Sequence, residues 1–244
     1  IFDTVRKELE ARDLVTMSGL FSRLAKQLSK ARSLPYDYAV VDEAQDVSVG
    51  QLRFLAALGR GRPDALFFAG DLGQRIFQQP FSWKELGVEV RGRSRTLRVN
   101  YRTSHQIRQQ ADRLLDIEVT DVDGNAERRK GTVSVFNGPE PIVSTFADAT
   151  AEIKAVTAWL NARVAEGIVP HEIGVFVRSI DQIDRARRAA DATGKKVRLL
   201  DESSEPVFGE ISVSTMHLAK GLEFRAVVVM ACDDEVIPLQ ARIE

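Results

Sequence analysis

Runs of consecutive apolar residues alternate along the chain with segments whose apolar residues recur at helical spacing. Short apolar runs bounded by polar residues or glycine are typical of strands that are buried on both faces of a parallel sheet. We expect such strands at 38–41, 65–69, 96–99, 133–136, 173–177, 197–200, 211–214 and 226–231. The helical segments between them are 50–58, 104–115, 150–166 and 182–192. This alternation predicts an α/β fold with mostly parallel sheets.

Two segments depart from the alternation. Residues 4–30 carry apolar side chains at helical spacing that is interrupted at 13–18, which predicts two helices. Residues 118–131 are polar and contain glycine, so the sequence predicts a loop there.

The composition is that of an ordinary globular protein. Hydrophobic residues make up 44% of the 244 and charged residues 28%, and no apolar run approaches the roughly 20 residues that a membrane span needs. The formal net charge of -1 gives no global signal for nucleic acid, so any DNA contact must come from a local surface. The single cysteine, Cys232, excludes an internal disulfide, and we expect a cytoplasmic protein. Because the chain starts at Ile1 without an initiator Met, we expect an excerpt of a longer protein.

The strongest chemical signal is the pair Asp42-Glu43, which directly follows the apolar run 38–41. Open α/β sheets bind ligands at the carboxyl ends of their strands. A carboxylate there can hold Mg²⁺ beside nucleotide phosphates, and its neighbour can deprotonate an attacking water. Asp42 is therefore the candidate for magnesium, and Glu43 is the candidate general base. Alternatively, acids after a strand cap a helix or lie in a solvated turn.

Two further polar segments follow predicted strands. The stretch from Gly70 to Phe77 contains glycines that allow a tight loop, which can bring Gln74 near a phosphate at the same sheet edge. Arg102 comes just after the strand predicted at 96–99, where its planar guanidinium can stabilise charge on a transferring phosphoryl group. A plain glycine-rich turn and an ordinary surface arginine are the alternative interpretations.

Four segments occur in a fixed order along the chain. They read Asp-Glu-Ala-Gln-Asp from Asp42, Gly-Asp-Leu-Gly-Gln-Arg-Ile-Phe from Gly70, Asn-Tyr-Arg from Asn100 and Thr-Met-His-Leu-Ala-Lys-Gly-Leu-Glu-Phe from Thr215. In this order they resemble motifs II, III, IV and V of the UvrD/Rep family of superfamily 1 DNA helicases. The resemblance implies RecA-like motor domains, ATP and Mg²⁺ as cofactors, and single-stranded or partly duplex DNA as the partner.

The resemblance also implies roles for single residues. Asp42 and Glu43 would handle Mg²⁺ and water, and Gln74 would sense the γ-phosphate. Tyr101 would stack on the adenine, and Arg102 would act as an arginine finger.

In motif V, the resemblance assigns Gly221 and Glu223 to the nucleotide site, where Glu223 bonds the ribose. Thr215, His217 and Lys220 would lie near the single-stranded DNA or couple it to the nucleotide.

The aromatic residues after motif III are the candidates for stacking on DNA bases. They are Phe77, the last residue of that motif, and Phe81 and Trp83 after it, whose spacing differs from the usual pattern of the family. Arg75 also occupies a place that a small residue usually fills. Core packing explains Trp83 equally well.

The family's pattern also defines what is missing. The 244 residues contain no Gly-x-x-x-x-Gly-Lys-Ser/Thr phosphate loop and no motif VI, so we expect them not to hydrolyse ATP alone. The short segment between 173–177 and motif V leaves no room for the 2B insertion of UvrD and Rep. We expect residues 1–96 to be the second half of the first RecA-like domain and 97–244 to be most of the second.

The family reading implies an ATP-dependent helicase or translocase that moves 3′ to 5′. Two other classes remain open at this point. One is a helicase-like scaffold that has lost ATPase function, and the other is a helicase fused to a nuclease or a further domain.

Overall fold

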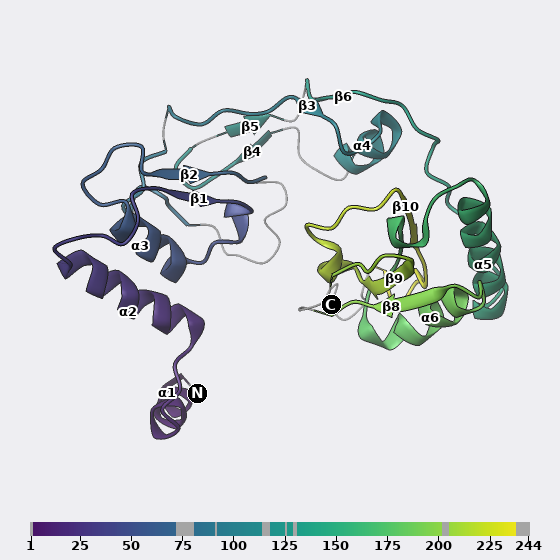
Figure 1. Cartoon of the computed structure of the whole chain (residues 1–244), viewed down its shortest axis with the longest axis horizontal. Helices are drawn as coiled ribbons and strands as arrows, with labels where there is room; N and C mark the ends of the chain where they lie inside the picture. The colour runs from purple at the N-terminus through teal and green to yellow at the C-terminus, as the bar shows by residue number, and fades with distance from the viewer. Residues whose placement is uncertain are drawn as a thin grey trace. The chain divides into compact units, whose positions relative to one another are not determined.

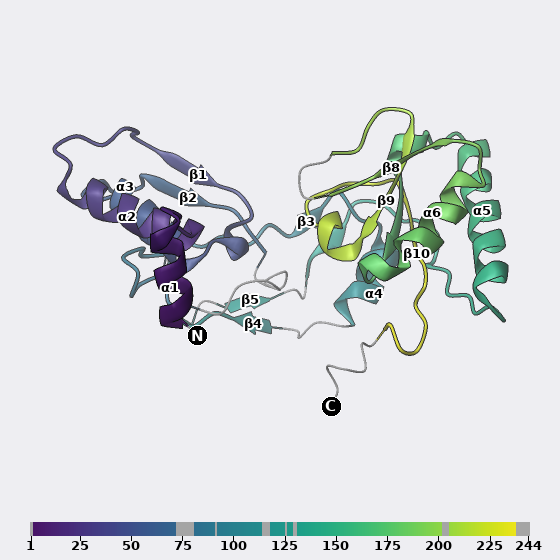
Figure 2. The same ribbon diagram turned by 90° about the horizontal axis from the view of Figure 1, so that it is seen from below.

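The computed structural model describes residues 2–71, 81–90, 92–113, 118–124, 126–128, 131–201 and 205–237. The chain divides into two compact units, 1–141 and 142–244, whose elements are labelled in Figures 1 and 2. Their boundary does not coincide with the one predicted at 96/97, because residues 97–141 make their contacts within the first unit. The assignment of 1–96 and 97–244 to two motor domains stays a prediction.

The first unit begins with two helices, as the sequence predicts. They are α1 (Phe2–Ala11) and α2 (Met17–Lys30), and the chain turns between them at Asp13, which has a φ of 52°. The hydroxyl of Thr16 accepts a hydrogen bond from the Gly19 N–H at 3.1 Å and so caps α2.

Two short parallel strands follow, each connected to a helix. Strand β1 (Ala39–Val41) leads through the 3₁₀ turn η1 (Ala44–Asp46) into α3 (Val49–Leu58), and β2 (Leu66–Phe68) then pairs in parallel with β1. Ser48 and Gln51 form a reciprocal capping box that starts α3. The chain therefore returns to the same sheet in the same direction.

The core of the first unit lies on one side of β1 and β2. Val41, Leu66 and Phe68 pack with Leu52 of α3 and with the buried ring of Trp83. Side chains alternate in a strand, so Val40 and Phe67 point to the opposite side, where both are exposed.

The rest of the first unit corrects two sequence predictions. The segment 118–131, predicted as a loop, contains an antiparallel hairpin of β4 (Glu118–Thr120) and β5 (Ala126–Arg128). Gly124 lies in the turn of the hairpin with a φ of 79°, which glycine adopts without steric cost. The strand predicted at 96–99 is instead β3 (Val99–Asn100), which pairs in parallel with β6 (Val133–Ser134). Helix α4 (His105–Asp112) lies between β3 and the hairpin in sequence.

The second unit is a parallel sheet covered by two helices on one face. Its strands are β7 (Ile173–Val177), β8 (Lys196–Leu199), β9 (Glu210–Thr215) and β10 (Ala226–Val229), in the order β10-β7-β9-β8. Helices α5 (Ala149–Ala165) and α6 (Ile183–Asp191) lie side by side along the sheet in Figure 2. The turns η3 (Pro170–Glu172) and η4 (Ile180–Gln182) flank β7. The prediction of a mixed α/β fold with parallel sheets is confirmed.

Alternation within the strands decides which side chains form the core of the second unit. Val175 of β7 and Val213 of β9 face the helices and are fully buried with Leu160 of α5. The helix α6 contributes alanines at its contact face, which lets it lie close to the sheet. These alanines are Ala186, Ala189 and Ala190.

The connection from β9 to β10 crosses the opposite face of the sheet. It passes over β7, because Phe224 packs edge-on against Phe176 with ring centroids 5.4 Å apart. A Cβ on Gly174 would lie 3.1 Å from Phe224. Within the described part of the chain, no helix is long and apolar enough to span a membrane.

Asp123, at the tip of the hairpin, holds the segment that carries Trp83. Its carboxylate accepts hydrogen bonds from the Ser82 hydroxyl, from the Trp83 N–H at 2.6 Å and from the Lys84 N–H at 3.2 Å. The bond from Ser82 is the largest influence and lowers the pKa of Asp123, partial desolvation opposes it, and the backbone bonds and the Lys84 charge lower it further. The hairpin is thereby attached to the core segment of the first unit.

Removing the charge of Asp123 should weaken the first unit in a pH-dependent way. Since the folded pKa is lower than the unfolded value of about 3.9, the carboxylate stabilises the fold above that value and loses this effect as the pH falls through the folded pKa. We expect Asp123→Asn to lower the urea midpoint at pH 7 and to lower it less at pH 3. The fluorescence of Trp83 in a Trp159→Phe background reports the transition.

Asp181→Asn is the matched control, because Asp181 is an exposed carboxylate of the second unit. It should leave the midpoint of the first unit unchanged at both pH values. Equal losses for Asp123→Asn at pH 7 and pH 3 would contradict a role for the charge.

Candidate functional site

The carboxyl ends of β1 and β2 bring the first two motifs together. Beyond the strands, the Ala69 N–H donates to the Val41 carbonyl at 2.8 Å, and the Ala44 N–H donates to the Ala69 carbonyl at 2.8 Å. The two chain segments therefore stay paired after the strands end. Asp42 follows β1 directly, and Asp71 follows β2 at the same edge.

Gln45 links these two strand ends through its side chain. Its Oε1 accepts a hydrogen bond from the Asp71 N–H at 3.0 Å, and its Nε2 donates to Oε2 of Glu43. The side chain is only 2% exposed, so both bonds lie away from solvent competition. Gln45 thus fixes the position of the Glu43 carboxylate relative to the end of β2.

Gly70 makes this link possible because it has no Cβ. A Cβ at this position would lie 2.5 Å from Oε1 of Gln45 and 3.1 Å from the Ala44 nitrogen. Any larger residue would have to displace the glutamine carboxamide or the backbone of β2. The glycine of the second motif is therefore required by close approach.

Glu43 has a left-handed backbone, with a φ of 51° and a ψ of 42°. A non-glycine residue in this region costs about 1–2 kcal/mol. The conformation is held by the Asp42 carboxylate, which accepts from the Glu43 N–H at 2.9 Å, and by the Asp46 N–H, which donates to the Glu43 carbonyl at 2.9 Å. Such outliers persist where the surroundings over-determine them, and they cluster at functional sites.

The residues at this edge fit a magnesium ion that is shared with nucleotide phosphates. Mg²⁺ is held in such sites by one or two carboxylates together with phosphates and water, rather than by a complete cage of side chains. Asp42 is exposed at the strand end and supplies such a carboxylate. Among the described residues, no group of three or more His, Cys, Asp or Glu side chains is arranged to hold a metal ion, and a shared site of this kind does not need one.

The predicted residues of the glycine loop are only partly described. Gln74, Phe77 and Arg75 lie outside the described residues. Phe81 and Trp83 are both buried, at 8% and 6% exposed, and Trp83 packs edge-on against Phe68 with ring centroids 5.0 Å apart. This burial favours the core-packing alternative for Trp83, because little of its ring is left for a base to stack on.

A turn after β3 presents Tyr101 and Arg102. The side-chain oxygen of Asn100 accepts from the Arg102 N–H at 2.9 Å and from the Thr103 N–H at 3.0 Å, which is an Asx turn. Ser104 then caps α4. Both Tyr101 and Arg102 are exposed, and the Tyr101 residue keeps 75% of its surface. Asn100 therefore shapes the turn, and the next two residues face solvent.

The motif of the second unit follows β9 at the carboxyl end of its sheet. Thr215 ends the strand, is 2% exposed, and its hydroxyl lies 3.4 Å from Nε2 of His217. The turn η5 (Met216–Ala219) follows, and Gly221 has a φ of 81°, which a residue with a Cβ rarely adopts. Lys220 is half-buried, whereas His217 and Glu223 are exposed.

Two family models match the chain. The model of the UvrD/REP helicase N-terminal domain matches residues 4–83, and that of the UvrD-like helicase C-terminal domain matches residues 195–244. Together they span more than half of the chain. The chain belongs to the UvrD/Rep-like helicases. Among curated proteins, none matches it.

The two matches of this UvrD/Rep-like helicase contain most of its candidate residues. The N-terminal match includes Asp42 and Glu43, and the C-terminal match includes Thr215 and Glu223. The chain therefore carries DNA helicase domains. The individual site residues are not assigned by these matches and stay predictions.

The sequence pattern predicts no role for Gln45, although the residue lies in motif II. The available signal was an amide between three carboxylates in a segment that follows a buried strand. A carboxamide can donate to a carboxylate and accept from a backbone N–H at once. The sequence does not predict that Gln45 is buried or which two groups it bonds.

The close approach of Gly70 and Gln45 predicts a measurable coupling. We expect Gly70→Ala to destabilise the first unit by about 1–3 kcal/mol, since the added methyl group overlaps the carboxamide. In a Gln45→Ala background the same substitution should cost less, because the nearest atom is gone. Urea unfolding of both single variants and the double variant gives the coupling free energy. Strictly additive losses would contradict the contact.

Proposed function

We propose that this chain supplies part of the motor of an ATP-dependent DNA helicase that moves along single-stranded DNA in the 3′ to 5′ direction. The observation that carries the proposal is the carboxylate pair at the shared carboxyl edge of β1 and β2, with Glu43 held in place by Gln45. The family membership supports the helicase class. ATP, hydrolysed with Mg²⁺ as cofactor, is the proposed energy source, and single-stranded or partly duplex DNA is the proposed partner.

In this proposal Asp42 and Glu43 divide the work at the strand ends. Asp42 would hold Mg²⁺, which when bound neutralises charge on the phosphates. Glu43 would accept a proton from the attacking water through its carboxylate. The hydrogen bond from Gln45 orients that carboxylate, and an oriented base is the requirement for general-base catalysis.

Other residues would bind the nucleotide and stabilise the transferring phosphoryl group. The exposed Tyr101 ring would stack on the adenine, and Arg102 would place its guanidinium on the γ-phosphate. Gln74 would contact the same phosphate. The proposal assigns Glu223 and Gly221 to the ribose side.

DNA contact would come from motif V and from the aromatic segment. Thr215, His217 and Lys220 lie on or directly after the end of β9. His217 is exposed and Lys220 is half-buried, whereas Thr215 is buried with its hydroxyl beside the His217 ring. Phe77 is the proposed base-stacking residue. The burial of Trp83 supports a packing role for that ring instead.

The motor would be completed by a phosphate loop and a motif VI, which these 244 residues do not contain. Without backbone N–H groups to hold the β- and γ-phosphates, the chain alone is expected to show no ATP turnover. Tests of catalysis therefore use the product of the complete reading frame.

The decisive substitution is Glu43→Gln in that complete product. It removes the base and keeps the size of the side chain, so we expect ATP turnover stimulated by single-stranded DNA to fall on the order of 10²-fold or more, with the nucleotide Kd nearly unchanged. Turnover by a coupled assay and Kd by a fluorescent nucleotide are measured on the same preparation.

Glu140→Gln serves as the control, because Glu140 is an exposed carboxylate that belongs to none of the four motifs. It should leave turnover at the parental level. Parental turnover by Glu43→Gln would remove Glu43 from catalysis, and no turnover by the unaltered complete product would favour a helicase-like scaffold.

A further inference from the structure

Glu152 is a buried carboxylate that no motif includes. It lies in the first turn of α5, is 8% exposed, and precedes the core residues Val156 and Leu160 on the same helix. Asp148 caps this helix by accepting from the Ala151 N–H at 2.8 Å. The positive end of the helix dipole favours a negative charge here, but a buried carboxylate still needs direct partners.

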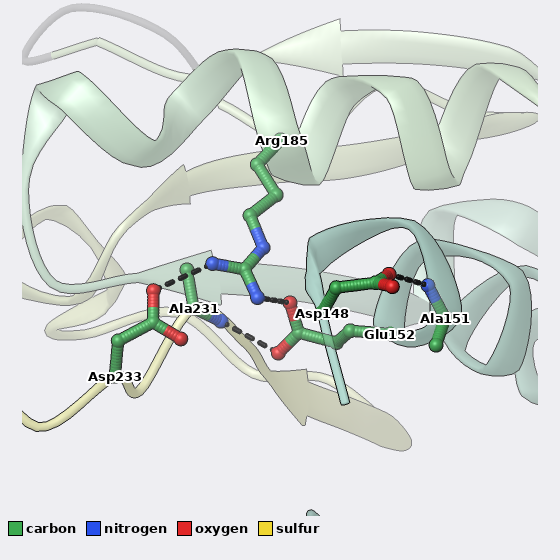
Figure 3. A network of polar contacts seen from close by, with 6 residues as sticks. All are labelled: Asp148, Ala151, Glu152, Arg185, Ala231 and Asp233. Atoms are coloured by element: carbon green, nitrogen blue, oxygen red, sulfur yellow. Dashed lines mark hydrogen bonds and ion pairs between the residues drawn. The ribbon is translucent and has the colours of Figure 1, made fainter. Parts of the chain in front are cut away.

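Helix α6 and the segment after β10 supply those partners, as Figure 3 shows. Oε1 of Glu152 accepts from the Ala231 N–H at 2.9 Å, and Oε2 lies 2.5 Å from a guanidinium nitrogen of Arg185 on α6. The other terminal nitrogen of Arg185 lies 2.6 Å from Asp233. We call Glu152, Arg185 and Asp233 the β10 clasp, because these side chains form the contacts around the residues that follow β10.

The two carboxylates of the clasp favour the charged form of Arg185. Burial taken alone would lower the pKa of Arg185, but the hydrogen bond to Asp233 and the charges of both carboxylates raise it overall. Arg185 therefore stays protonated and bonds two carboxylates from different parts of the chain. A planar guanidinium suits this arrangement, because it directs separate N–H groups to separate acceptors.

The backbone enclosed by the clasp has an unusual conformation. Ala231 is fully buried and has a φ of 57°, in the left-handed region that residues with a Cβ rarely adopt. The sequence there is apolar and contains no glycine, and it predicts a strand over 226–231, yet β10 ends at Val229. The local sequence does not favour a turn at this point, so tertiary contacts must impose it.

Asp233 extends the constraint into the following residues. Its carbonyl accepts from the Val236 N–H at 2.8 Å and from the Ile237 N–H at 3.0 Å, so the clasped residue also opens the next turn. We propose that the β10 clasp is a positioning device, in which side chains of α5 and α6 force the left-handed turn at Ala231 and so set the direction of the exit segment 232–237. Because β10 follows motif V, the clasp connects the helical layer to the chain leaving that motif. The inference does not depend on the proposed ATPase function.

Amide hydrogen exchange tests the clasp at the bonds that define it. In Glu152→Ala we expect exchange at Ala231, Val236 and Ile237 to accelerate on the order of 10-fold or more, while amides within β7 and β9 keep their protection. Glu166→Ala is the matched control, because Glu166 lies at the exposed end of the same helix and pairs with Arg163. It should change none of the three rates.

A second substitution distinguishes a role in forcing the turn at Ala231 from a loss of stability across the whole sheet. Glycine accepts the left-handed conformation without cost, so Ala231→Gly in the Glu152→Ala background should restore protection at Val236 and Ile237. It should not restore protection at residue 231, whose acceptor is gone. Unchanged rates in Glu152→Ala, or a parallel rise across the whole sheet without rescue by glycine, would overturn the proposal.

Arg185→Lys keeps the test available if Glu152→Ala does not fold. A lysine is a point charge that cannot direct separate N–H groups to both carboxylates. Exchange at Val236 and Ile237 should therefore rise, while Ala231 keeps its bond to Glu152 and changes less. Exchange rates in Arg185→Lys that equal the parental rates at all three amides would also overturn the proposal.

Discussion

The carboxamide of Gln45 joins the ends of β1 and β2, and the geometry of the candidate catalytic edge depends on this contact. The two strands are three residues long each and pair only with one another among the described elements. Such a short ladder does not by itself fix the residues that follow it. Gln45 supplies an acceptor to the Asp71 N–H and a donor to Glu43, and Gly70 leaves the space for both.

The second unit terminates a strand by the same physical means. Glu43 and Ala231 both follow a parallel strand by two residues, both have a left-handed backbone, and both are held by buried polar side chains. In the first unit the Gln45 amide holds the Glu43 side chain and the Asp42 carboxylate holds its backbone N–H. In the second unit the Glu152 carboxylate, paired with Arg185, holds the Ala231 N–H. A strained turn of this kind sends the chain away from the sheet sharply, and its stability comes from contacts rather than from local preference.

The elements that the sequence predicts well are those governed by local rules. An apolar run predicts β7 to the residue, and the helical segments predicted within 4–30 and at 50–58 contain α2 and α3. The hairpin at 118–128 was missed because polarity was equated with a loop, whereas backbone pairing there depends on the turn at Gly124. The early end of β10 was missed because it is imposed by Glu152, which is 79 residues away in sequence from Ala231.

The candidate site divides in the same way. Asp42, Glu43 and Gly70 were found from their places after apolar runs, since the ends of parallel strands meet at one edge. The role of Gln45 was not predictable, because burial and partners depend on two segments at once. Trp83 shows the reverse case, in which an aromatic residue beside a motif is explained by packing against Phe68.

The central claim is that Gln45 holds Glu43 as the base, and Gln45→Glu in the complete gene product tests it most directly. The new carboxylate can still accept from the Asp71 N–H, but it replaces the donor to Glu43 with a negative charge. Two adjacent carboxylates raise the pKa of one of them. ATP turnover with single-stranded DNA should therefore fall on the order of 10-fold or more at neutral pH and recover in part as the pH rises and the base loses its proton, with nucleotide Kd nearly unchanged. Parental turnover across the pH range would contradict the account.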